Sequence, residues 1–136
     1  MTVGDHKPRA AGRRVVVVED NDRSRRLIVH VLGRDGFETT AVATGEEALE
    51  LVRADPPDLL LLDIQLAGSA LDGEAVLRLV REDPRTSGLV VVALTAFAVR
   101  GDEERFLAAG FDGYIPKPID VGSVVGQLLA YLEPSP

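Results

Sequence analysis

The chain alternates short apolar runs with longer segments in which apolar residues recur at helical spacing. Three runs, Val15–Val18, Leu59–Leu62 and Leu89–Leu94, are apolar at consecutive positions. Strands of this kind are buried on both faces, which is typical of a parallel sheet covered by helices on both sides. Weaker strands are predicted at Thr39–Ala43 and Gly113–Ile115. The pattern therefore predicts five strands.

A predicted helix follows each predicted strand. The first, Arg23–Arg34, carries Leu27, Ile28, Val31 and Leu32 on one stripe. The second helix is predicted from Thr44-Gly45-Glu46-Glu47 and the apolar Ala48, Leu51 and Val52, and Pro56-Pro57 ends it. The other helices are predicted over Gly73–Glu82, over Ala98–Ala109, and from a cap at Asp120 through Leu132. This regular alternation with short connections predicts a doubly wound α/β sandwich.

Acidic and other polar residues stand at the carboxyl ends of these strands, where ligands of open α/β sheets gather. Glu19 and Asp20 follow the first strand, Asp63 the third, Thr95 the fourth and Lys117 the fifth. Three clustered carboxylates repel one another unless a cation neutralises them, and oxygen ligands favour a hard ion such as Mg²⁺. A carboxylate can also become an aspartyl phosphate, with the metal and a lysine offsetting the charge of the transferring group.

Each of these residues also has an ordinary structural explanation. Asp20 or Asn21 could cap the following helix, and Asp63 could be a loop carboxylate or a helix cap. Thr95 could simply end a strand, and a single Lys117 is usually solvated. These explanations do not predict that all of the residues fall at carboxyl ends, so the combination points to a site.

The motifs that carry this combination are Val15-Val-Val-Val-Glu-Asp-Asn21, Leu59-Leu-Leu-Leu-Asp-Ile-Gln65, Asp72-Gly73, Ala93-Leu-Thr-Ala96 and Lys117-Pro118. Over about residues 13–133 the chain resembles the receiver domain of bacterial two-component response regulators, the family of the chemotaxis protein CheY. The segment from Thr95 to Arg105 is more particularly similar to the DivK type of single-domain regulator. The resemblance implies a flavodoxin-like (βα)5 fold with a parallel five-stranded sheet in strand order 2-1-3-4-5.

The resemblance also implies roles for the residues of the site. Asp63 would accept a phosphoryl group from a histidine kinase or phosphotransfer protein. Mg²⁺ would be bound by Glu19, Asp20, Asp63 and the backbone carbonyl of Gln65. Lys117 would pair with a phosphoryl oxygen. The protein would then be a switch rather than an enzyme, with at most self-phosphorylation from small phosphodonors and slow self-dephosphorylation.

Further residues would take part in switching. Thr95 would bond another phosphoryl oxygen, and Tyr114 would turn inward as the aromatic switch residue. Outside the resemblance, a tyrosine at the position of Tyr114 is more often a half-buried strand residue than a switch. Gln65 and Phe97 fall where family members tune the loss of the phosphate. The Lys117–Pro118 peptide bond is expected to be cis.

Protein partners follow from the same resemblance. The altered face would be formed by the fourth helix, fifth strand and fifth helix, about residues 98–132, and would contact a downstream protein effector. A homodimer across this face is left open. Kinase docking is expected near the first helix and the loop after the fifth strand. Arg23, Arg25 and Arg26 could take part, or could form a solvated basic turn.

The sequence departs from the family pattern in two places. Leu66-Ala-Gly-Ser-Ala-Leu71 lengthens the loop before Asp72-Gly73 by about two residues and contains no proline, a change that surface loops tolerate. Its path is not predicted. Glu19 stands where many members have aspartate, and both forms occur in the family.

Composition excludes or disfavours several classes of function and site. The net charge is −7 although residues 1–14 are basic, so the acidic body is a poor partner for nucleic acid. The absence of cysteine excludes disulfides and thiolate metal sites. No apolar run approaches the length of a membrane span or signal peptide, so we expect a cytoplasmic protein. The expected organisation is a flexible basic tail over 1–13, a receiver domain over 14–133 and a short tail over 134–136, with no fused output module.

The sequence leaves three alternatives to the receiver switch. A degenerate receiver could act as an unphosphorylated scaffold, although every expected site residue is present. A haloacid-dehalogenase-type phosphatase would need an aspartate two residues after the nucleophile, where this chain has Gln65. A flavin-binding module would need a phosphate-cradling loop after the first strand, where Glu19 and Asp20 would repel the phosphate.

Overall fold

The computed structural model describes residues 10–66, 68–96 and 102–133, without the side chains of residues 102 and 103. Five parallel strands form one sheet in the order β2-β1-β3-β4-β5, which confirms the predicted topology. The strands are β1 (Arg14–Val18), β2 (Glu38–Val42), β3 (Leu59–Asp63), β4 (Val90–Thr95) and β5 (Gly113–Pro116).

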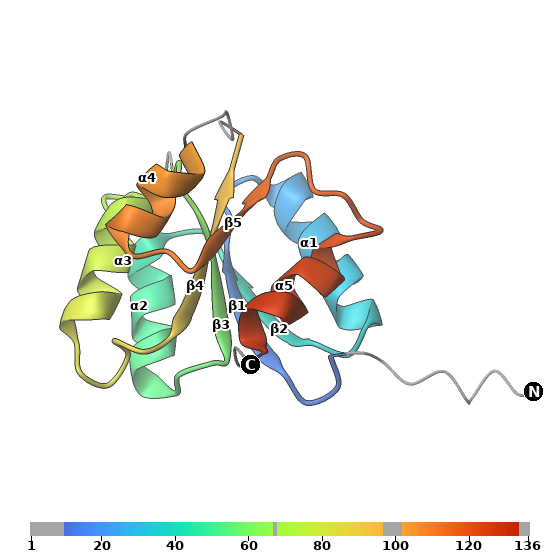
Figure 1. Ribbon diagram of the computed structural model, residues 1–136, viewed down its shortest axis with the longest axis horizontal. Helices are drawn as coiled ribbons and strands as arrows, with labels where there is room; N and C mark the ends of the chain where they lie inside the picture. The colour runs from blue at the N-terminus through green and yellow to red at the C-terminus, as the bar shows by residue number, and fades with distance from the viewer. Residues whose placement is uncertain (1–9, 67, 97–101, 134–136) are drawn as a thin grey trace, which may run out of the picture.

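Helices cover both faces of the sheet, as a doubly wound fold requires. They are α1 (Asp22–Arg34), α2 (Gly45–Ala54), α3 (Gly73–Glu82), α4 (Asp102–Ala109) and α5 (Val124–Leu132). Figure 1 shows α1 and α5 on one side of the sheet and α2, α3 and α4 on the other. No helix in the described part of the chain is long and apolar enough to cross a membrane.

The consecutive apolar residues of β1 and β3 serve two separate cores. Val16, Val18, Leu60 and Leu62 belong to the core beneath α2, α3 and α4. Their neighbours in sequence belong to the core beneath α1 and α5, and these are Val15, Val17, Leu59 and Leu61. Because side chains alternate across a strand, a strand buried on both faces must be apolar at every position.

Three helices begin with a side-chain cap that the sequence supplies. The Oδ1 atom of Asn21 accepts a hydrogen bond from the Ser24 N–H at 2.9 Å, and Asp72 accepts one from Ala75 at 2.8 Å. Thr44 accepts one from the Glu47 N–H at 3.2 Å. Each cap satisfies a backbone donor that the first helical turn leaves unpaired. Because Asn21 is the residue that caps α1, capping does not explain the neighbouring Asp20.

Two local predictions were wrong. Asp120 does not cap α5, which begins at Val124; its carboxylate instead accepts a hydrogen bond from the Gly122 N–H at 2.9 Å and closes a turn. Leu27 does not join the buried stripe of α1, because its side chain is 44% exposed. Both residues lie at the edge of their helices' packing, where spacing alone does not fix the partner.

The structure also bears on the expected bounds of the N-terminal tail and of the fourth helix. Ala10 is fully buried and its N–H donates to the Asp35 carbonyl at 2.8 Å, so the chain packs against the domain before residue 14. The helix expected over 98–109 is described from Asp102, and residues 98–101 lie outside the described part.

Arg81, in the last turn of α3, links the end of α4 to the start of β5. Its guanidinium donates to the carbonyls of Gly110 at 2.8 Å and Ser87 at 2.9 Å, and it pairs with Asp112 at 3.0 Å. Asp112 also accepts a hydrogen bond from the Val91 N–H at 2.8 Å. This network fixes the start of β5 against β4. It therefore also sets the position of the carboxyl end of β5, which lies at the opposite edge of the sheet.

The structure predicts opposite effects for two glycine substitutions. A Cβ atom at Gly73 would collide with the backbone of Asp63 and Ile64, whereas one at Gly33, inside α1, would meet nothing within 4 Å. We expect Gly73→Ala to lower the free energy of unfolding by about 1–3 kcal/mol. Gly33→Ala should raise it by about 0.5–1 kcal/mol, because alanine favours the helix. Urea unfolding followed by circular dichroism measures both, and equal effects would contradict the close packing of Gly73 under β3.

Candidate functional site

The carboxyl ends of β1, β3 and β5 bring three charged side chains into direct contact. Glu19 follows β1, Asp63 ends β3 and Lys117 follows β5. The Nζ atom of Lys117 lies 2.9 Å from Oε1 of Glu19 and 3.2 Å from Oδ2 of Asp63. The predicted convergence of these three residues is therefore present in the structure.

Three carboxylates form a compact acidic cluster. Glu19, Asp20 and Asp63 each offer one oxygen, and these oxygens lie within 4.8 Å of one another. Glu19 is completely buried, yet among the described residues neither of its carboxylate oxygens accepts a hydrogen bond of good geometry. A buried carboxylate without well-formed hydrogen bonds is poorly satisfied. An all-oxygen donor set of this kind fits a hard divalent cation such as Mg²⁺.

Burial and mutual repulsion perturb the protonation of the cluster. Burial, together with the Glu19 carboxylate beside it, raises the pKa of Asp63 to about 7. Burial alone would raise the pKa of Glu19 as well, but Asp63 and the Lys117 ammonium outweigh burial and hold that pKa below its usual value. Without a cation, the pair therefore keeps a proton on Asp63 below neutral pH.

Lys117 keeps its charge in this environment. Burial by itself would lower the pKa of Lys117, but the two carboxylates outweigh burial and raise it. The side chain is positioned from its backbone, because the Lys117 N–H donates to the Thr95 carbonyl at 2.7 Å. The peptide bond between Lys117 and Pro118 is cis. A fixed ammonium group thus faces Asp63 at all pH values near neutral.

The backbone after β3 fixes the other side of Asp63. The Gln65 N–H donates to Oδ1 of Asp63 at 3.0 Å, while Lys117 holds Oδ2. The Ile64 N–H donates to the Leu94 carbonyl at 3.1 Å and so prolongs the pairing with β4. Each oxygen of the carboxylate therefore has its own donor, and the plane of the group is set by two different elements.

The remaining predicted residues lie at different distances from this centre. Thr95 is buried at the end of β4, next to β3 and β5. Tyr114 is half-buried and packs toward α4, with its ring 5.9 Å from the ring of Phe106. The side chain of Gln65 is exposed. Phe97 lies outside the described residues.

Arg25 has a contact that the sequence analysis missed. Its guanidinium donates to the backbone carbonyl of Glu19 at 3.0 Å and to Asp22 at 2.7 Å. The side chain thus reaches from α1 back to the turn that carries Glu19 and Asp20. A basic residue one turn inside a helix that follows an acidic pair is the only signal of this contact in the sequence, and it equally suits a surface position.

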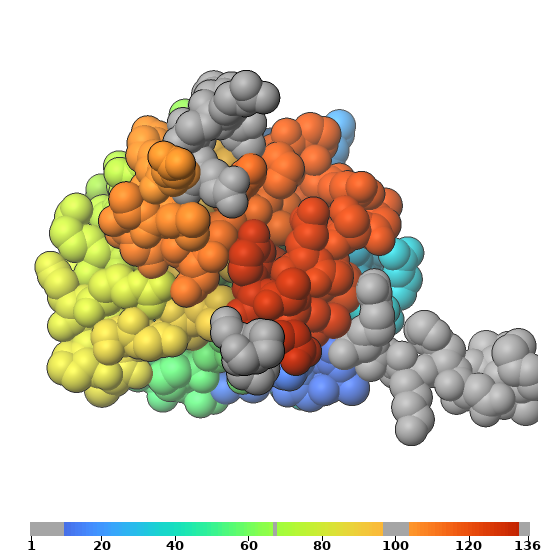
Figure 2. All heavy atoms as spheres, viewed as in Figure 1, coloured from blue at the N-terminus to red at the C-terminus, as the bar shows by residue number. Residues whose placement is uncertain are grey.

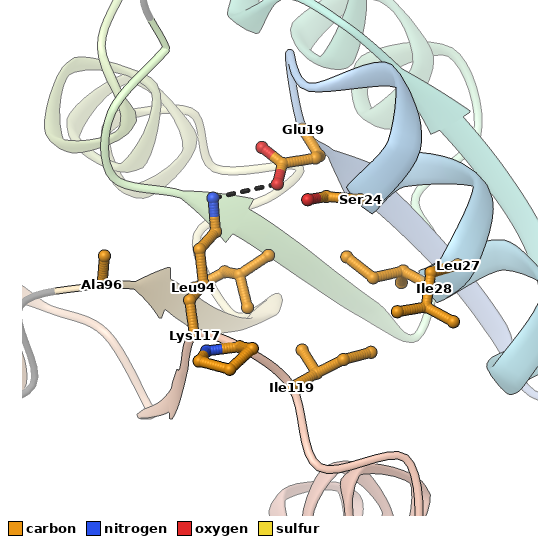
Figure 3. Close-up of a pocket in the computed structure, with 9 residues that line it drawn as sticks. Glu19, Ser24, Leu27, Ile28, Leu94, Ala96, Lys117 and Ile119 are labelled. Atoms are coloured by element: carbon orange, nitrogen blue, oxygen red, sulfur yellow. Dashed lines mark ion pairs between the residues drawn. The ribbon is translucent and has the colours of Figure 1, made fainter.

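A groove of 310 Å³ opens beside the charged cluster, between α1 and the segment after β5. Figure 3 shows Leu27 and Ile28 of α1 facing Ile119 across it, with the ion pair of Lys117 and Glu19 at one end. The exposure of Leu27 is explained by this position. The walls of the groove are mainly apolar, and one end of it is charged.

Comparison with known proteins gives consistent results. Residues 15–128 match the response regulator receiver domain family. The polar-differentiation response regulator DivK of Brucella ovis is 38% identical over 118 residues, which are 87% of this chain and 94% of that protein.

Solved structures agree with this match. The receiver domain of a sensor histidine kinase from Pseudomonas aeruginosa, which has a magnesium ion coordinated in its active-site cleft, is 31% identical with a TM-score of 0.80; the alignment covers 90% of this chain and 98% of that one. Chemotaxis protein CheY4 of Vibrio cholerae is 22% identical with a TM-score of 0.81, covering 89% and 99%, and shows the fold.

The raised pKa of Asp63 predicts how stability depends on pH without a cation. A carboxyl with a pKa of about 7 when folded and near 3.8 when unfolded takes up a proton on folding between these values. Its stabilising contribution is complete below the unfolded pKa and is lost as pH rises through the folded pKa. The free energy of unfolding should therefore fall over this window in the wild type, and fall less in Asp63→Asn.

Urea unfolding in the presence of a chelator, repeated across this pH range, measures the effect. Above pH 7 the Asp63→Asn protein should be the more stable of the two by several kcal/mol. Asp72→Asn is the matched control, since asparagine also caps a helix and Asp72 is exposed. Parallel curves for wild type and Asp63→Asn would contradict a buried, protonated Asp63.

Proposed function

The chain belongs to the response regulator receiver domain family, and on that basis we propose that it is a phosphorylation switch whose acceptor is Asp63. The observation that carries the proposal is the placement of this buried carboxylate, which has the Lys117 ammonium on one oxygen and two further carboxylates beside it. The phosphoryl donor is a histidine kinase or a phosphotransfer protein.

The proposed chemistry is a transfer between two nucleophiles. An oxygen of deprotonated Asp63 forms a bond to phosphorus while the bond from phosphorus to the donor's imidazole nitrogen breaks, and solvent supplies the proton that the imidazole takes up. Lys117 stays positively charged and offsets negative charge on the transferring group. Because the pKa of Asp63 is raised, any cation that displaces its proton increases the reactive fraction.

The residues that would hold Mg²⁺ are Glu19, Asp20 and Asp63, with the backbone carbonyl of Gln65. When bound, the ion would neutralise the three carboxylates and supply positive charge toward the phosphoryl oxygens. Arg25, through its hydrogen bond to the Glu19 carbonyl, holds the turn that presents two of these ligands.

The proposed output is a change on the face formed by α4, β5 and α5. Thr95 would bond a phosphoryl oxygen from the end of β4, and Tyr114, which packs against Phe106 of α4, would carry the change to the surface. Figure 2 shows α4 and α5 on the same face of the molecule. Leu107 of α4 is 49% exposed, and we propose this face as the contact surface for a downstream protein.

The proposed docking site for the phosphoryl donor is the groove between α1 and the segment after β5 (Figure 3). Leu27 and Ile119 supply apolar walls close to Asp63 and Lys117, so a helix seated there would bring its histidine to the acceptor. Arg23 and Arg26 are exposed nearby on α1, whereas Arg25 is engaged with the Glu19 carbonyl.

The acceptor is tested by intact mass after incubation with acetyl phosphate and Mg²⁺. We expect wild type and Asp72→Asn to gain one phosphoryl group, and Asp63→Asn to gain none. Omission of Mg²⁺ should abolish the gain in wild type and in Asp72→Asn. If wild type gains nothing and also fails to bind beryllofluoride as a stable mimic, the switch function is wrong and an unphosphorylated scaffold takes its place.

The docking site is tested with Leu27→Glu and the equally exposed Leu107→Glu as control. Histidine kinases and phosphotransfer proteins of the source organism, labelled with radioactive ATP, are screened for transfer to each variant. We expect Leu27→Glu to slow transfer roughly tenfold or more, as loss of a central apolar contact does, and to leave phosphorylation by acetyl phosphate unchanged. Equal transfer to both variants would place the docking site elsewhere.

A further inference from the structure

The lengthened loop between β3 and α3 is joined to the acceptor by a series of hydrogen bonds. The Gln65 N–H contacts Asp63, as described above, and the next residue, Leu66, is buried. The Leu66 carbonyl accepts a hydrogen bond from the Ser69 N–H at 3.1 Å. At the far end, the Gly73 N–H donates to the Ile64 carbonyl at 3.2 Å. The loop therefore leaves and re-enters the domain next to Asp63.

Ser69 and Glu46 fasten this loop to the start of α2. The Ser69 hydroxyl donates to Oε1 of Glu46 at 2.6 Å and accepts a hydrogen bond from the Gly45 N–H at 3.1 Å. The same Glu46 oxygen accepts a hydrogen bond from the Leu71 N–H at 3.1 Å. We call this set of contacts among Glu46, Ser69, Gly45 and Leu71 the loop clamp. It joins residues 23 to 25 apart in sequence.

Charge-assisted hydrogen bonds and close packing both support the loop clamp. The Ser69 hydroxyl holds the pKa of Glu46 below its usual range, so Glu46 is charged and its hydrogen bonds are charge-assisted. A Cβ atom on Gly45 would lie 2.5 Å from Val76 and 3.2 Å from the Leu71 carbonyl, so glycine permits the close approach of α2 to the loop. Without a proline to stiffen it, a lengthened loop gains its definition from such cross-contacts.

We propose that Glu46 and Ser69 are positioning residues for the phosphorylation site. By fixing the far side of the loop, they hold Gln65 with its N–H on Asp63 and its carbonyl ready for the cation. Preorganised ligands bind more tightly because less conformational freedom is lost on binding. This inference rests on the proposed function, since it assigns the clamp a role in Mg²⁺ binding at that same site.

The test compares Ser69→Ala, Ser69→Thr and Glu46→Gln with wild type, and uses Glu50→Gln, an exposed change on the same helix, as control. Amide hydrogen exchange of the metal-free proteins reports the clamp itself, through the Ser69 and Leu71 amides. Titration with MgCl₂, followed by amide NMR shifts, gives the dissociation constant. Urea unfolding gives the overall stability.

In Ser69→Ala and Glu46→Gln we expect faster exchange of the loop amides and an Mg²⁺ dissociation constant raised about tenfold, the lower end of what loss of an outer-shell contact costs. Ser69→Thr keeps the hydroxyl and should restore both values, while Glu50→Gln should match wild type. Overall stability should change little, since the clamp lies at the surface.

The possible outcomes distinguish failure of this inference from failure of the proposed function. Wild type that binds Mg²⁺, with both clamp variants binding equally well, overturns the positioning role alone, whether or not the loop amides exchange faster. A tenfold loss in Ser69→Thr as well would also overturn it, because the hydroxyl would not be the cause. Wild type that binds no Mg²⁺ overturns the proposed function and this inference together.

Discussion

The structure depends on holding three carboxylates and one ammonium group together at the edge of a sheet that is otherwise apolar. Parallel strands β1 and β3 bring Glu19 and Asp63 to the same level, and in the described part of the chain both carboxylates lie within hydrogen-bonding distance of the Lys117 ammonium group. One positive charge cannot balance three negative ones, so in the absence of a metal the cluster retains a proton on Asp63. The negative charge of the site is thus incompletely balanced, and binding of a cation or a phosphoryl group would change that balance.

The surrounding structure is organised to keep this cluster from relaxing. Asn21 caps α1 and Arg25 holds the carbonyl of Glu19, so the acidic turn cannot swing toward solvent without losing both contacts. On the opposite edge Arg81 fixes the beginning of β5, and the Lys117 N–H is bound to Thr95 at its end. Close packing and hydrogen bonds from four elements therefore keep the three carboxylates within 4.8 Å of one another, although their mutual repulsion favours separation.

Much of this arrangement was predictable because it follows from periodicity and topology. Apolar residues at consecutive positions in β1 and β3 predicted a sheet buried on both faces, and the polar residues that end these strands predicted a common site. Spacing could not predict the exposure of Leu27, because a helix stripe does not reveal that a groove opens beside it. The turn at Asp120 and the contact of Glu46 with Ser69 were also beyond reach, since each depends on a loop path and not on a period.

The loop between Asp63 and α3, which the sequence analysis expects to be longer than the family pattern, bears directly on the proposed site. Extra residues between Asp63 and α3 increase the conformations open to Gln65, and the entropy of that freedom opposes any ordered ligand. Leu66, buried in the core, and Ser69, bonded to Glu46, reduce the freedom at two points on the described part of the loop. The site residues alone therefore do not define the proposed switch, because the clamp that we propose to order Gln65 includes Glu46 of α2.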